Sequence, residues 1–455
     1  MPETVDPQPV TRSPALFAVP PLGESARLAR NLWLFGVFAV IIVVPAARFH
    51  VLGPMLGLSV ILGAITMPGD LRLGRFDSLR LLIFGFAGAA LVPVVIGVLR
   101  SNPGWRDVGI ALVAGPVAWF FIGNLADRWL VERLPTAISV GTVVVTAAMF
   151  MLLSGFGRDF VRAITPFAFG SLAAGTARVS FSGTSSLIAT VPFLATVVWD
   201  SFRYRLELRH RPLLLVGFGL GLMAVLISGR QGVIGAVALT PMLIWLTGRV
   251  GFAHLGTPNP RNMRQAMTLM VAGVSVAIAV VMLLGLNPLR LPQDLLASVG
   301  LMENQGNIRI ERTTGVRSAQ AQSLLRGWGE RPLIGHGAGA VTDDFFTWRG
   351  YEIGTEFTDT PRPWRAELSY HLLLFEAGLL GIALYLGAVV IAFRMLRRRF
   401  VSVPDATARM MARAAIVASV ALAISTAANP LARTIGLQWA FVLPVIVLAG
   451  WSRKS

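Results

Sequence analysis

Long apolar runs recur along almost the whole chain, and they constrain its fold more than any other feature. A helix needs roughly 20 apolar residues to cross the hydrocarbon core of a bilayer. Runs of about that length lie at 31–47, 50–67, 79–99, 107–125, 135–154, 184–200, 212–228, 231–247, 265–286, 367–393, 409–428 and 434–451. Lipid offers no partner for unpaired backbone groups, and no run alternates as a barrel strand would. The sequence therefore predicts an all-α polytopic membrane protein with about twelve transmembrane helices.

Composition excludes the main soluble classes. Charged residues make up 14% of the 455 residues, against about 25% in soluble domains, and the mean hydropathy is +0.67. Neither a soluble globular enzyme nor a disordered chain has this balance. The net charge of +17 is better explained by loop arginines that set topology or meet anionic lipid than by nucleic acid binding. With no cysteine and five histidines, the chain gives no basis for a metal site, and we expect no metal or cofactor.

Arginine placement predicts the orientation in the membrane. Basic clusters at 72–80, 203–211 and 394–409 fall in loops on the same side as the N-terminus, whereas the short turns on the other side are poorer in arginine. Because positively charged loops stay in the cytoplasm, both termini are expected there, with the chain in the cell membrane. The proline-rich stretch 1–30 has no apolar signal core and is expected to be a disordered tail.

Two external segments differ from simple turns. Segment 155–183 is too polar to span cleanly, which predicts a half-helix or an interfacial segment. Segment 287–366 is too long for a structureless loop, and its aromatic residues favour a folded cap. The expected organisation is a tail at 1–30, nine spans within 31–286, the cap at 287–366, three spans within 367–451 and a short cytoplasmic tail at 452–455.

Two arginines are candidates for holding an anion. Arg230 lies in a tight external turn, 228–232, whose glycines would let a ligand approach the backbone. Its guanidinium either reaches the lipid headgroups or presents paired donors to a diphosphate. Arg317 opens a short amphipathic helix that is expected to end at Gly327. The glycine run 335–339 beyond it follows no strand, which indicates a close-packed turn more than a phosphate loop.

The start of the span at 367–393 carries a candidate general base. Glu367 and His371 are four residues apart, so on a helix they would share one face. A carboxylate at the mouth of a span is costly unless it faces protein or water, and desolvation would make it a better base. The alternative is an acid that marks the helix start, where the dipole favours negative charge. Glu376 falls on the opposite face and is expected to be structural, and Asp343-Asp344 fits a solvated turn better than a metal site.

Five short motifs combine into a recognisable pattern. They are Arg317…Trp328…Pro332-Leu-Ile-Gly335-His-Gly337, Glu367-Leu-Ser-Tyr370, Glu376-Ala-Gly378-Leu-Leu-Gly381, Ser228-Gly229-Arg230-Gln-Gly232 and, more loosely, Arg178-Val-Ser-Phe-Ser-Gly183. This combination resembles the O-antigen ligase and Wzy-type polymerase family. The similarity covers about residues 212–381. It implies the family's GT-C-like fold of transmembrane helices, with a large external loop between two late spans.

The resemblance also implies an activity. Such enzymes are metal-independent glycosyltransferases that move a glycan from a polyprenyl-diphosphate-linked donor to a sugar hydroxyl of a glycan or lipid-glycan acceptor, outside the cytoplasm, and so polymerise or ligate a surface polysaccharide. Arg230, Arg317 and Arg178 would hold the diphosphate. The family carries its histidine base where this chain has Glu367, so Glu367 is expected to take the proton, with His371 as helper or substitute.

Two other classes remain open. A secondary transporter has the same hydropathy, but it should show paired repeats and broken helices near the midplane, and neither is evident in the sequence. A peptidoglycan-type polymerase would also place an acid in its external loop, with a different order of motifs. Beyond substrate, the only partner expected is membrane lipid.

Overall fold

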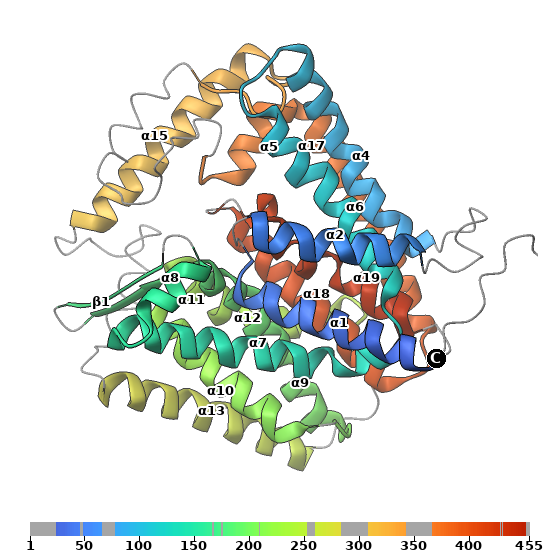
Figure 1. Ribbon diagram of the computed structural model, residues 1–455, viewed down its shortest axis with the longest axis vertical. Coiled ribbons are helices and arrows are strands. Elements are labelled where there is room, and N and C mark those ends of the chain that lie inside the picture. The colour runs from blue at the N-terminus through green and yellow to red at the C-terminus, as the bar shows by residue number, and fades with distance from the viewer. Residues whose placement is uncertain are drawn as a thin grey trace, which may run out of the picture.

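The computed structural model is almost entirely helical (Figure 1) and describes residues 24–45, 49–65, 78–165, 168–173, 176–208, 210–252, 260–283, 308–342, 366–427, 429 and 431–451. Within these residues, eight helices are long and apolar enough to cross a membrane, or nine if one bent pair is a single span. These helices support a polytopic membrane protein. The expected dozen spans are not confirmed.

Six of the eight are single helices, namely α1 (Glu24–Val43), α4 (Ser78–Leu99), α7 (Arg128–Ser154), α10 (Arg211–Ser228), α17 (Ser369–Ser402) and α18 (Ala406–Thr426). The other two join shorter pieces, namely α5 (Trp105–Gly109) with the π-helix η1 (Ile110–Ala114) and α6 (Gly115–Leu125), and the 3-10 helix η2 (Ser182–Ser186) with α9 (Leu187–Tyr204). Because α1 begins at Glu24, the last residues of the expected disordered tail 1–30 are helical.

The expected single span at 231–247 is broken. It consists of α11 (Gln231–Ala238) and α12 (Thr240–Arg249), which are bent by 41°. Pro241 lies at the start of α12 and has no N–H, so the hydrogen bond that would continue α11 is missing there. A single unbroken span was expected at 231–247, and the break corrects that expectation.

Several further elements complete the fold. The expected spans at 50–67 and 434–451 are apolar helices that are shorter than a full span, α2 (Phe49–Ile65) and η4 (Ile435–Leu437) with α19 (Trp439–Trp451). The run at 265–286 corresponds to α13 (Pro260–Leu283), which packs beside α9 and α10. A short 3-10 helix, η3 (Leu431–Arg433), precedes η4.

Segment 155–183 contains the one hairpin among the described residues. It begins with the seven-residue helix α8 (Arg158–Ile164), in the segment for which a half-helix or an interfacial segment was expected. The antiparallel strands β1 (Phe169–Ala173) and β2 (Thr176–Ser180) then follow, and η2 begins directly after them. The hairpin was not predicted, because small residues interrupt any regular alternation along it.

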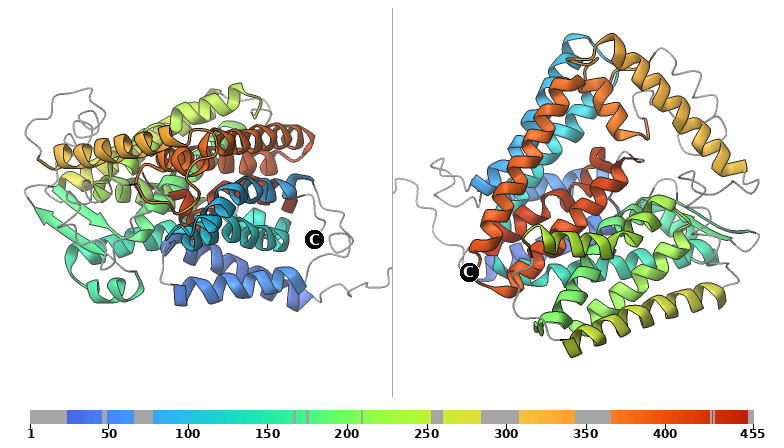
Figure 2. Two further views of the ribbon diagram at one scale, coloured as in Figure 1. Left: turned by 90° about the horizontal axis from the view of Figure 1, so that it is seen from above. Right: turned by 180° about the vertical axis from the view of Figure 1, so that it is seen from behind.

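The bundle is built around α9. Almost every residue of α9 is buried, and α7, α10, α13 and α18 pack around it (Figures 1 and 2). A separate arm of α4, α5, α6 and α17 extends from this bundle, at the upper right of Figure 1. From the tip of the arm, α15 (Ile308–Glu330) leans back toward the bundle.

The expected cap 287–366 is described only in part. Its described portion, 308–342, consists of α15 and the turn that follows it, while 287–307 and 343–365 lie outside the described residues. A small second hydrophobic core joins α15 to α17, and it contains Leu324, Ala340, Ala366, Leu372 and Phe375. The described part of the cap therefore packs on the arm.

A set of contacts brings four helix ends together. Arg30 pairs with Asp127 at 2.6 Å, which joins the start of α1 to the start of α7. Arg128 lies 3.7 Å from Asp405, the N-cap of α18, and its guanidinium stacks over Trp451 at the end of α19. The starts of α1, α7 and α18 and the end of α19 therefore share one end of the bundle.

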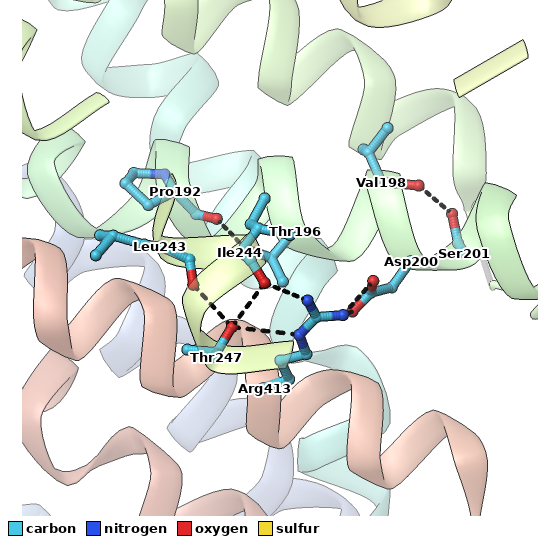
Figure 3. Close-up of polar contacts among 9 residues, drawn as sticks. All are labelled: Pro192, Thr196, Val198, Asp200, Ser201, Leu243, Ile244, Thr247 and Arg413. Carbon is cyan, nitrogen blue, oxygen red and sulfur yellow. Dashed lines mark hydrogen bonds and ion pairs between the residues drawn. The ribbon is translucent and has the colours of Figure 1, made fainter. Parts of the chain in front are cut away.

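A buried ion pair ties α9, α12 and α18 together (Figure 3). Arg413 of α18 donates from Nη1 to both carboxylate oxygens of Asp200 in α9, at 2.7 and 3.0 Å. Its Nη2 donates to the carbonyl of Ile244, and its Nε lies 3.4 Å from Oγ1 of Thr247, both in α12. Both charged side chains are at most 2% exposed, so the pair joins the three helices inside the packed bundle.

Candidate functional site

Arg230 lies in a defined turn between α10 and α11. Gly229 adopts a left-handed conformation (φ +59°) that ends α10, and Arg230 returns to an extended conformation as the N-cap residue of α11. The Ser228 hydroxyl accepts from the Arg230 N–H at 3.2 Å and donates to the carbonyl of Val225. The Arg230 side chain is thereby directed from a fixed backbone position into the protein.

The partners of the Arg230 guanidinium are two hydroxyls. Nη1 donates to Oγ1 of Thr184 and to Oγ of Ser185, at 3.0 Å each. Both residues belong to η2, and both are buried. Neither hydroxyl was predicted from the sequence, where the hydroxyl-rich run 182–186 at the start of an apolar span is only a weak signal.

Arg317 and Glu367 are in direct contact. Nε of Arg317 donates to Oε2 of Glu367 at 3.1 Å, and Oε1 of Gln320, one turn further along α15, accepts from the backbone N–H of Glu367 at 3.2 Å. The Arg317 and Glu367 side chains are 32% and 46% exposed, so a ligand can reach both. Gln320 is fully buried and fixes the backbone that carries the carboxylate.

These two residues also lie near Arg230. Burial lowers the pKa of the Arg230 guanidinium, the Glu367 carboxylate raises that pKa, and the Arg317 cation lowers it. Geometry agrees with this, since Gly232 packs against the Asn429 amide and the Asn429 carbonyl accepts from the hydroxyl of Ser369, two residues after Glu367. Three of the candidate residues, contributed by three distant parts of the chain, therefore form one cluster of two guanidiniums and one carboxylate, which we call the Arg230 cluster.

Polar contacts from α17 and α18 complete its surroundings. The Ser369 hydroxyl donates to the carbonyl of Asn429 at 2.9 Å, and the Ser425 hydroxyl donates to the carbonyl of Gly232 at 3.3 Å. The start of α17, the end of α18 and the start of α11 therefore meet at the Arg230 cluster. The Asp200–Arg413 pair lies at the opposite ends of α9 and α12 and contributes no side chain to it.

His371 is not placed as expected. The helix α17 begins at Ser369, and Glu367 precedes it, so the two residues do not share a helical face. A helix cannot extend back to Glu367, because Leu368 has non-helical backbone angles (φ −81°, ψ 82°). The ring of His371 is half-buried and makes no hydrogen bond or ion pair with any residue that the structure describes.

Arg178, the third expected arginine, is described only by its backbone. It lies in β2 opposite Ser171 of β1, close in sequence to η2. Its side chain lies outside the described part of the structure, as do Asp343 and Asp344.

Glu376 has the structural role that the sequence predicts. Its Oε1 accepts from the N–H of Gly339 at 2.9 Å, and its Oε2 accepts from Arg433. The turn 332–339 also bonds to the backbone on both sides of Gly378, where α17 is kinked (φ +61°, ψ −169°). The glycine run therefore forms a close-packed joint between α15 and α17, and its Gly339 N–H is used by Glu376.

The chemistry open to the Arg230 cluster follows from its charges. Two guanidiniums offer planar, paired donors to phosphate oxygens, and a partly exposed carboxylate beside them can accept a proton. Among the described residues, no three His, Asp or Glu side chains are grouped as metal ligands would be. No family model, curated protein or solved structure matches this chain.

Proposed function

We propose that the protein transfers a glycan from a polyprenyl-diphosphate-linked donor to a sugar hydroxyl of an acceptor glycan or lipid-glycan. The observation that carries this proposal is the grouping of Arg230, Arg317 and Glu367 at one end of a bundle of membrane-spanning helices. A diphosphate attached to a membrane lipid must lie at such a boundary, and a sugar hydroxyl needs a base beside it.

Each residue has a separate role in the proposed reaction. The acceptor oxygen attacks the anomeric carbon, the bond from that carbon to the phosphate oxygen breaks, and the diphosphate leaves with the electron pair. Arg230 and Arg317 stabilise the negative charge that develops on this leaving group. Glu367 takes the proton of the attacking hydroxyl. Arg317 contacts Glu367 directly, so the base and the electrophilic group are held side by side.

The proposal extends to the setting of the site. Basic loops at 203–211 and 394–409 favour the cytoplasm for the opposite end of the bundle, which leaves the Arg230 cluster outside, in a cell membrane with both termini inside. The GT-C-like fold with about twelve spans implied by the resemblance belongs to this proposal as well.

A lipid-linked oligosaccharide profile of a deletion strain tests the proposal. A polymerase deletion accumulates single repeat units on the lipid carrier, and a ligase deletion accumulates long uncapped chains. Complementation with the wild-type gene should clear the intermediate, and complementation with Glu367→Gln should not. An unchanged profile would reject glycan transfer.

One observation favours a second candidate, a secondary transporter. The bent pair α11–α12 is a broken helix, and transporters use broken helices to bind substrate inside the membrane. Flux of labelled oligosaccharide lipid or small solutes into proteoliposomes, without formation of a new glycosidic bond, would favour this candidate over the transferase.

A further inference from the structure

We propose that Thr184 and Ser185 are positioning residues that set the orientation of the Arg230 guanidinium toward the donor diphosphate. This inference rests on the proposed function. It adds two residues, both in η2, that no motif of the sequence singled out.

The hydrogen-bond inventory of Arg230 Nη1 supports the assignment. Nη1 carries two N–H groups, and the two hydroxyl oxygens at 3.0 Å accept one each. The Thr184 hydroxyl has only one proton, and it donates that proton to the carbonyl of Phe181 at 2.7 Å. Its oxygen can therefore only accept from Arg230, and the direction of the guanidinium plane is fixed.

The hydroxyls themselves are held rigidly. Thr184 is completely buried and Ser185 is 9% exposed. η2 runs directly into α9, the central helix of the bundle, and Gly183 packs against the carbonyl of Val43 so closely that a Cβ there would lie 2.5 Å from it. Arg230 is therefore anchored to a closely packed part of the fold, which permits little displacement of the two hydroxyls.

The chemical type of these partners is informative. A buried arginine that serves only the fold pairs with a carboxylate, as Arg413 does with Asp200. Hydroxyls hold the guanidinium by charge-assisted hydrogen bonds but do not cancel its charge. The Glu367 carboxylate near Arg230 is bonded to Arg317, so the two guanidiniums and one carboxylate of the Arg230 cluster keep a net positive charge for an anion, which is the property that a diphosphate site needs.

The orientation matters for rate. A displacement of about 1 Å in a positioning group can reduce catalysis by about 10²-fold. A guanidinium released from Thr184 and Ser185 would retain its charge but lose its fixed direction. Removal of these hydrogen bonds should therefore lower the rate of glycan transfer while the protein stays folded.

The experiment compares glycan transfer by the full-length protein in membranes, with a lipid-linked donor, for a set of variants. Thr184→Val keeps the shape of threonine and removes the acceptor oxygen, and we expect kcat/KM to fall by about tenfold to a hundredfold. Thr184→Ser keeps the hydroxyl and should stay near wild type, and Ser185→Ala should show a smaller loss than Thr184→Val. Thr190→Val is the matched control, because Thr190 is equally buried in α9 and its hydroxyl has no partner among the described residues.

A double-mutant cycle with Arg230→Lys separates positioning from packing. If Thr184 acts through Arg230, then Thr184→Val should cost little further activity once Arg230→Lys is present. Two results would overturn this inference alone. In the first, the double variant loses activity by the product of the two single losses. In the second, Thr184→Val and Thr190→Val are equally active while Arg230→Lys is inactive. An active Arg230→Lys would instead reject both the diphosphate role of Arg230 and this inference. Thermal unfolding of each variant identifies any loss that is due to misfolding.

Discussion

Arg317 and Glu367, 50 residues apart in the chain, form an ion pair in which Nε donates to Oε2 over 3.1 Å. Both side chains are partly exposed, and pairs of this kind contribute only about 0–1 kcal/mol to stability. The buried contacts of Gln320 and Leu324, in contrast, are what hold α15 against α17. The ion pair therefore contributes little to folding, and its members can be changed without unfolding the protein.

The first prediction concerns the general base. Glu367→Gln is nearly isosteric with the native residue but cannot take a proton, so glycan transfer should fall by about 10²–10⁴. The level of protein in the membrane should stay unchanged. His371→Gln should retain activity, because the His371 ring makes no hydrogen bond or ion pair with the described part of the Arg230 cluster. Transfer assays on membranes measure both, and an inactive His371→Gln beside an active Glu367→Gln would assign the base to the histidine.

The second prediction concerns the two arginines. A lysine keeps the charge but lacks the planar pair of donors, so Arg230→Lys and Arg317→Lys should each lose about 10²-fold in transfer. Arg326→Lys, on an exposed position of the same helix as Arg317, is the control and should stay active. Insertion is checked by the amount of each variant in the membrane fraction. Normal activity of both Arg230→Lys and Arg317→Lys would mean that these arginines serve only membrane topology and packing.

The members of the Arg230 cluster could be found from sequence for a simple reason. Arg230 and Glu367 each border an apolar segment, where a charge needs an explanation, and Arg317 begins the amphipathic helix expected in the external loop. Their mutual contact could not be found in this way, because it depends on how α15 leans back from the arm, and no local pattern encodes that arrangement.

Two other features, the hydroxyls that bind Arg230 and the buried ion pair, were not predicted, because their sequence signals are weak within an apolar chain. Thr184 and Ser185 lie at the start of a predicted span, where polar residues are tolerated and indicate no particular role. Asp200 and Arg413 lie 213 positions apart, and each alone resembles a charge near the end of a helix. Only the packing of α9 against α18 brings them together.

The third prediction concerns topology. The native chain has no cysteine, so single cysteines report directly on sidedness. Gln322→Cys, on an exposed position of α15, should react with an impermeant maleimide in intact cells, whereas Arg205→Cys, exposed at the end of α9, should react only after lysis. Ser323→Cys is the matched control, because that position is 4% exposed and should label slowly in both cases. Labelling of Gln322→Cys only after lysis would place α15 in the cytoplasm and remove the basis of the mechanism.

The fourth prediction concerns the buried ion pair. Asp200→Asn leaves the Arg413 charge buried without a counterion, which should reduce the free energy of unfolding by about 3–5 kcal/mol. The exposed pair of Arg128 and Glu132 is the comparison, and Glu132→Gln should cost about 0–1 kcal/mol. Combining Asp200→Asn with Arg413→Met removes the unpaired charge and should recover most of the loss. Thermal unfolding in detergent measures all three, and equal stability of the Asp200 and Glu132 variants would contradict the structural role of the pair.

The last prediction concerns the kink of α17. Gly378 has φ +61° and ψ −169°, a conformation that only glycine adopts readily, and a Cβ there would lie 2.5 Å from the backbone of Leu333 and Gly335. Gly378→Ala should therefore cost at least about 1–3 kcal/mol and release the turn 332–339 from α17. Since this turn is the joint between α15 and α17, the spacing of Arg317 and Glu367 should change, and transfer should fall together with the melting temperature. Gly387→Ala is the control in the same helix, because no atom lies within 4 Å of the new Cβ. It should leave glycan transfer unchanged and leave the melting temperature unchanged or slightly raised, because alanine favours a helix. Equal behaviour of the two variants would show that the kink does not position the site.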